Sequence, residues 1–120
     1  MNWRISIVLA LLGSGLALAI AQFQAFPGYL DSDYYFAGGV QLAQGKGFTE
    51  PYLWNYLDDP EGLPHPSNTY WMPLSSIIAA TGMWLTRQTT YQAGRLGFIF
   101  LAGLVPVVAA ALAYSFSKRR

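Results

Sequence analysis

The chain has 120 residues, of which 53% are apolar and 11% charged, with a formal net charge of +1. The apolar residues stand in long blocks, which excludes an ordinary soluble domain and favours a membrane protein. The few basic residues are scattered and form no patch suited to nucleic acid, so we expect no nucleic-acid partner. Because the chain has no cysteine, a disulfide framework and a thiolate metal site are both excluded.

A first membrane-spanning helix is predicted over residues 5–26. Residues 5–25 carry no charge, and they are numerous enough to cross a hydrocarbon layer about 30 Å thick. The basic head before this run favours an N-terminus in the cytoplasm. Ala19-Ile20-Ala21 also has the small-x-small form of a signal-peptide cleavage site, so removal of the first helix stays open as an alternative.

A large external loop is predicted over residues 27–71. Pro27-Gly28 ends the first helix, and we expect Asp31 or Ser32 to cap a short surface helix over residues 32–44. All acidic residues of the chain lie in this loop, namely Asp31, Asp33, Glu50, Asp58, Asp59 and Glu61. The expected apolar face of the surface helix contains Tyr35, Phe36, Gly39, Leu42 and Ala43. Such a helix is expected to lie along the membrane surface.

Two further spanning helices are predicted, over residues 72–90 and 95–116. The apolar run in 72–90 is too short by itself to span the membrane. The predicted span therefore includes Arg87, whose side chain would extend to the lipid headgroups. The predicted fold class is therefore an all-α membrane protein, with about three transmembrane helices in a single region covering residues 1–120. We expect it in the plasma (inner) membrane. Strict alternation of three spans places Lys118-Arg119-Arg120 outside, which opposes the usual enrichment of basic residues on the cytoplasmic side.

Asp31 and Asp33 are the main candidate site residues. Helix capping alone explains an isolated Asp-x-Asp. A carboxylate just outside a membrane span is also placed to meet a lipid headgroup, where it can act as a general base towards an acceptor hydroxyl. Two carboxylates this close can instead share a divalent cation through their oxygens. Metal dependence therefore stays open at the level of the sequence.

Several short motifs resemble the amino-terminal part of the GT-C membrane glycosyltransferases, most closely the protein O-mannosyltransferase and aminoarabinose transferase type. The motifs are Leu30-Asp31-Ser32-Asp33-Tyr34-Tyr35, Gly45-Lys46-Gly47, Pro64-His65-Pro66 and Tyr70-Trp71-Met72-Pro73-Leu74. Enzymes of this type have a first helix followed by a large external loop with surface helices and an acidic residue at its start. They transfer a sugar from a polyprenyl-phosphate lipid. Asp31 and Tyr35 match the family's Asp-Glu-x-x-Tyr pattern, whereas Ser32 stands in the place of the Glu.

The resemblance implies that Asp31 is the catalytic base and that Asp33 is a second carboxylate or metal ligand. It makes His65, Arg95 and Tyr35 candidate contacts to the lipid phosphate or substrate, although a loop histidine is usually just polar and an arginine at a helix start usually an interfacial anchor. Because family members are several hundred residues long, it also implies a fragment that is inactive by itself. The implied partners are membrane lipids, a polyprenyl-phosphate sugar donor and the remaining helices of a larger transferase. The alternative is a small non-enzymatic membrane protein whose acidic aromatic loop docks a partner.

Overall fold

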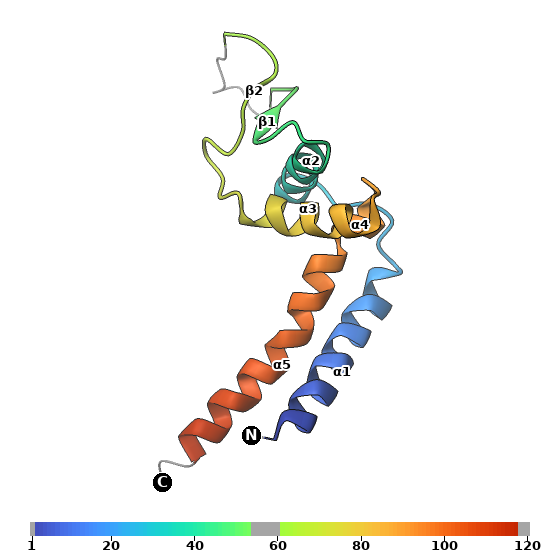
Figure 1. The fold of residues 1–120 in the computed structure, drawn as a ribbon, viewed down its shortest axis with the longest axis vertical. Coiled ribbons are helices and arrows are strands. Elements are labelled where there is room, and N and C mark those ends of the chain that lie inside the picture. Colours follow the sequence, from blue (N-terminus) through green and yellow to red (C-terminus); the bar gives the residue numbers. More distant parts are fainter. Residues whose placement is uncertain (1, 54–60, 118–120) are drawn as a thin grey trace. The chain divides into compact units, whose positions relative to one another are not determined.

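The computed structural model describes residues 2–53 and 61–117, so the Lys118–Arg120 cluster lies outside the described residues. The elements in chain order are α1 (Trp3–Ala21), α2 (Asp31–Ala43), β1 (Thr49–Glu50), β2 (His65–Pro66), α3 (Leu74–Thr86), α4 (Tyr91–Gly94) and α5 (Leu96–Ser117) (Figure 1). The chain divides into two compact units. One, which we call the hairpin unit, contains α1 and α5 from Phe98 onward, and the other, the loop unit, comprises Phe26–Gly97.

In the hairpin unit, α1 and α5 pack against each other through small residues. A Cβ atom added to Gly13 would lie 3.0 Å from Gly103 Cα, and one added to Gly103 would lie 2.7 Å from the Ala10 carbonyl oxygen. The Ser14 hydroxyl donates a hydrogen bond of 3.2 Å to the Ile99 carbonyl oxygen. Residue numbers in α1 fall as those of their contacts in α5 rise, so the two helices are antiparallel (Figure 1). Close approach through glycine and serine is typical of helix pairs in membranes.

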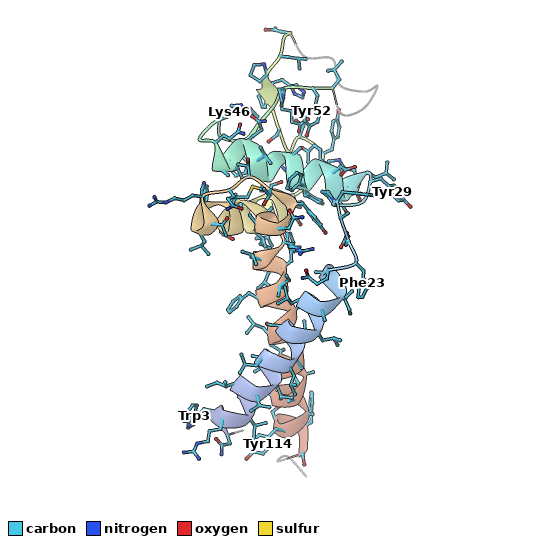
Figure 2. The ribbon with its side chains drawn as sticks, turned by 90° about the vertical axis from the view of Figure 1, so that its right-hand side faces the viewer. Trp3, Phe23, Tyr29, Lys46, Tyr52 and Tyr114 are labelled. Carbon is cyan, nitrogen blue, oxygen red and sulfur yellow. The ribbon has the colours of Figure 1, made fainter. Side chains whose placement is uncertain are left out.

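Both helices of the hairpin are long and apolar enough to cross a membrane. The two candidate spans are α1, with 19 residues, and Tyr91–Ser117, with 27. At 1.5 Å per residue, α1 measures about 28 Å, which matches the hydrocarbon thickness of a typical bilayer. Figure 2 shows Trp3 and Tyr114 at one end of the hairpin unit and Phe23 at the other. Aromatic side chains at both ends suit the two interfaces of a membrane.

In the loop unit, α2 and α3 lie side by side and meet through their smallest residues (Figure 1). A Cβ atom added to Gly39 would lie 2.8 Å from the Ala79 Cβ atom and 3.2 Å from the Ser76 carbonyl oxygen. Larger residues at Gly38 or Gly39 would therefore push the two helices apart. Ala79, Met83 and Ala93 form the centre of the core, and Phe36, Val40 and Ala43 pack around it.

The helix α3 differs from the span that the sequence predicts over residues 72–90. It covers Leu74–Thr86, which is 13 residues and about 20 Å, shorter than the hydrocarbon layer. It ends there because Arg87 adopts the left-handed conformation, with φ of 57°, and the Gln88 amide bonds back to the Met83 carbonyl. Among the helices of the described residues, α3 is not one of the two that are long enough to span a membrane.

The start of α2 also differs from expectation. Its cap residue is Leu30, and no side chain caps the helix, so the expected capping by Asp31 or Ser32 is wrong. The chain turns into the helix through Gly28 and Leu30, whose φ angles are 119° and 57°, and Asp31 and Ser32 already belong to the first turn. The buried tyrosine of α2 is Tyr34, and Tyr35 on the expected apolar face is only half-buried.

Candidate functional site

Asp31 and Asp33 lie in the first turn of α2, and both carboxylates are exposed. Negative charge is favourable there because the first turn of a helix leaves backbone N–H groups unpaired. Within the described residues, neither carboxylate makes a hydrogen bond or an ion pair. An exposed carboxylate without a fixed partner is free to accept a proton or to meet a ligand.

A metal site at these two carboxylates would need further ligands. The described residues contain no group of three or more histidine, cysteine or acidic side chains that could hold a metal ion. A cation shared by Asp31 and Asp33 would therefore take its remaining ligands from water, from substrate phosphate or from outside this part of the chain, as magnesium ions commonly do.

The loop unit also contains a polar cluster, called here the buried polar cluster, formed by the buried Tyr34 and Glu50 and the half-buried His65 and Asn68. The Tyr34 hydroxyl donates a hydrogen bond of 2.5 Å to Glu50 Oε1 and accepts one of 2.7 Å from the Asn68 backbone N–H. Tyr34 and Glu50 are each only 3% exposed. Burial raises the pKa of Tyr34 well above its ordinary value, and its hydrogen bond to Glu50 raises it further. The phenol therefore stays protonated and serves as a donor to the carboxylate.

His65 closes the other side of this cluster. Its Nε2 atom lies 3.8 Å from Glu50 Oε2 and 3.1 Å from the Tyr52 carbonyl oxygen, and its Nδ1 atom lies 3.1 Å from the Pro66 carbonyl oxygen. Both ring nitrogens thus face oxygen atoms that can accept a hydrogen bond. Nearby, burial and the charge of Glu50 raise the pKa of Tyr52 to about 12.

Local turns and the short pairing of β1 with β2 bring the residues of the buried polar cluster together. Gly45 and Gly47 have φ angles of 75° and 73°, which lets the chain reverse direction after α2. The antiparallel pairing of β1 with β2 then sets Glu50 opposite His65. Sequence reasoning selected His65 but missed Tyr34 and Glu50. A usable signal was the position of Glu50 in Phe-Thr-Glu-Pro-Tyr, a carboxylate among aromatic and β-branched residues.

The other predicted site residues lie elsewhere in the loop unit. Arg95 ends α4, and its guanidinium carbon lies 5.6 Å from the centre of the Tyr91 ring, within cation–π range. The Tyr35 ring meets the Tyr34 ring edge-on, with 5.7 Å between their centres. The structure thus brings His65 and Tyr34 together, whereas the described residues show no hydrogen bond or ion pair between His65 and Asp31.

No family model, curated protein sequence or solved structure matches the chain. Its function is therefore inferred from the residues of the loop unit and from the order of the helices along the sequence.

Proposed function

We propose that the chain forms the amino-terminal part of a membrane glycosyltransferase of the GT-C type, which moves a sugar from a polyprenyl-phosphate donor to an acceptor at the external face. One observation carries this proposal. An apolar helix is followed by a compact loop unit, and the first turn of that unit's first helix presents the exposed carboxylate of Asp31. The enzymes that the sequence motifs resemble have a first helix, an external loop with surface helices and an acidic residue at its start. In this chain, α1, the pair α2 and α3, and Asp31 correspond to these parts.

The proposed topology has two spans, with α1 and α5 in the membrane and the loop unit outside. Three spans would place Lys118–Arg120 on the external side. With two spans, both chain ends lie on the cytoplasmic side, so Arg4 and Lys118–Arg120 obey the tendency of basic residues to stay inside. All acidic residues of the chain then lie outside. The external region in this proposal is Phe26–Gly97, which replaces the expected loop over 27–71.

In the proposed reaction, Asp31 acts as the general base. It would accept the proton of the acceptor hydroxyl as that oxygen attacks the sugar carbon, while the polyprenyl phosphate leaves with the bonding electrons. Such assistance is typically worth about 10²–10⁴ in rate, provided that the carboxylate comes within hydrogen-bond reach of the hydroxyl. The exposure of Asp31 leaves room for both partners.

The test measures sugar transfer from a radiolabelled polyprenyl-phosphate donor in membranes of cells that carry the chain together with the rest of its transferase. Asp31→Asn should preserve expression and fold, because the carboxylate has no partner in the described residues. It should lower the transfer rate by about 10²–10⁴, because an amide cannot accept the proton. Glu61→Gln, which removes another exposed carboxylate of the same loop, is the matched control.

Asp33→Asn separates the metal-free reaction from one that uses a shared cation. Without a metal it should cost less than Asp31→Asn, and with a shared cation it should cost about as much and the wild-type rate should fall in a chelator. Near-normal transfer by Asp31→Asn would overturn the proposal. The alternative function, a non-enzymatic docking loop, then becomes the better explanation of the acidic loop.

A further inference from the structure

The helix α3 has two apolar faces, and only one of them packs against α2. Ser76, Ala79, Ala80 and Met83 are buried, and their spacing of three and four residues places them on one face. The opposite face consists of Leu74, Ile78, Thr81 and Leu85, with Ile77 and Trp84 beside it. No residue of α3 is charged. A helix that is apolar all round normally has both faces covered.

This second face of α3 is mostly exposed, although Ile77 and Ile78 are half-buried. Leu74 is 64% exposed, Trp84 52% and Leu85 85%. Tyr70, Trp71 and Met72, which are also exposed, precede α3 directly. Tryptophan and tyrosine beside such a face are typical of a membrane–water interface.

The long apolar helix α5 begins on this same face. Gly97, the second residue of α5, packs on α3: a Cβ atom added there would lie 2.7 Å from the Ile78 carbonyl oxygen and 3.3 Å from Thr81 Oγ1. These contacts lie within the loop unit. The chain therefore passes into the candidate span at a residue, Gly97, that packs on this face of α3.

The basic residue next to α3 fits the same environment. Arg87 follows the helix directly and is exposed. Its aliphatic stem can lie along apolar surface while its guanidinium reaches lipid phosphate groups. The 13 residues of α3 are too few to cross the hydrocarbon layer, and an apolar helix of this length suits an orientation parallel to the membrane plane.

We propose that α3 is an interfacial helix, and that its face formed by Leu74, Ile78, Thr81 and Leu85 rests in the outer surface of the lipid bilayer. This inference rests on the proposed membrane insertion of α1 and α5, and it is independent of glycosyl transfer. It assigns the bilayer as the partner of Leu85, which at 85% is the most exposed of the large apolar side chains of α3. The loop unit would thus contact the membrane through α3, in addition to being connected at its two ends to the proposed spans α1 and α5.

Spin labelling can test this inference directly, because the chain has no cysteine to remove. Single cysteines replace Leu85 and, separately, Leu74, and each carries a nitroxide in the full chain reconstituted in vesicles of phosphatidylcholine and phosphatidylglycerol. Gln44, exposed after α2, is the water control, and Leu12, exposed on α1, is the hydrocarbon control. Power saturation compares collisions of each label with oxygen, which enters lipid, and with a nickel chelate, which stays in water.

The labels at Leu85 and Leu74 should both be more accessible to oxygen than to the chelate, at a depth of about 5–10 Å below the headgroups, as for other interfacial helices. A chelate accessibility equal to that at Gln44 would overturn the inference while leaving insertion intact. Exclusion of both reagents from these positions would also overturn it, because protein rather than lipid would then cover the face. A water-like result at Leu12 would instead refute the membrane insertion on which the inference rests.

Discussion

Removal of the Tyr34 hydroxyl should release the segments 48–53 and 61–68, which contain β1 and β2, from α2. In Tyr34→Phe the ring still fills its buried position, but two hydrogen bonds disappear together. Glu50 loses the donor at 2.5 Å from Oε1, and the Asn68 backbone N–H loses its acceptor. Glu50 would then lie buried without this donor, and the half-buried Asn68 N–H would lack the acceptor that the structure gives it.

The size of the effect follows from these two losses. A hydrogen bond to a charged group contributes about 1.5–3 kcal/mol, and a buried donor left unpaired costs about 1–3 kcal/mol. Because the short ladder can relax and admit water, the lower part of the summed range applies, about 2.5–4 kcal/mol. Since every 1.4 kcal/mol is a factor of ten, local opening of the loop should become about 60- to 700-fold more frequent.

Hydrogen–deuterium exchange of the full chain in lipid nanodiscs measures this opening. Amides of residues 48–50, 65, 67 and 68 should exchange faster in Tyr34→Phe by that factor, because the ladder and the Ser67 N–H bond to the Phe48 carbonyl open with the cluster. Amides of α5 in the hairpin unit should keep their wild-type rates.

Tyr35→Phe is the matched control, because it removes a neighbouring phenol of α2 that makes no hydrogen bond in the described residues. Its exchange should stay within a factor of about two of wild type, as for surface substitutions worth under 0.5 kcal/mol. Equal exchange in Tyr34→Phe and Tyr35→Phe would refute the assignment of the buried polar cluster as the link between the loop and α2.

The remaining predictions concern topology, pH and helix packing. Cysteines at Ser67 and Thr89 should both react with a membrane-impermeant maleimide added outside intact cells, whereas reaction from opposite sides would restore the three-span arrangement. The Tyr52 phenol should titrate near pH 12 in an absorbance titration of the folded chain. Because its folded pKa lies above the ordinary value near 10, its contribution to stability is complete below pH 10 and is lost as the pH rises through 12; a phenol titrating near 10 in the folded chain would contradict the burial of Tyr52. Gly103→Leu should destabilise the hairpin unit by about 1–3 kcal/mol in thermal unfolding in detergent, because its side chain meets the Ala10 carbonyl. Gly15→Leu, at a position with nothing within 4 Å, should have little effect, and equal losses would argue against close packing at Gly103.

The sequence alone predicted the helices whose position is determined by residues close together in the chain. Uncharged runs indicated the two long apolar helices, expected over 5–26 and 95–116, and the structure has Trp3–Ala21 and Leu96–Ser117 there. The surface helix was expected over 32–44, next to the observed Asp31–Ala43. Local composition carries these elements because a run of apolar residues and a helix-ending glycine act over one or two turns.

Whether residues 74–86 form a membrane span or a helix packed on α2 depends on residues far away in the chain. Its composition suits a span as well as it suits a helix packed on α2. What separates the two is the close approach of Gly39 to Ala79, forty residues later, and the left-handed turn at Arg87. Neither feature is visible in residues 72–90 alone.

In the candidate site too, the sequence alone revealed the local features and missed the contacts between distant residues. Asp31 could be singled out because a carboxylate that follows an apolar helix is a local pattern. The contact of Tyr34 with Glu50 depends on β1 and β2, two strands of two residues each. Strands this short show almost no alternation of apolar and polar residues in the sequence. Such short strands escape sequence patterns.

The antiparallel pairing of the first helix with the last has a consequence for biosynthesis. Ser14 and its partner Ile99 are 85 residues apart in the chain, so at about 5–20 residues per second the ribosome needs roughly 4–17 s to add that length. All contacts between α2 and α3 lie within Phe26–Gly97 and can form before α5 is complete. During this interval the Ser14 hydroxyl can bond a carbonyl of its own helix, as serine does in membrane helices. The loop unit can therefore fold first, and the hairpin closes last.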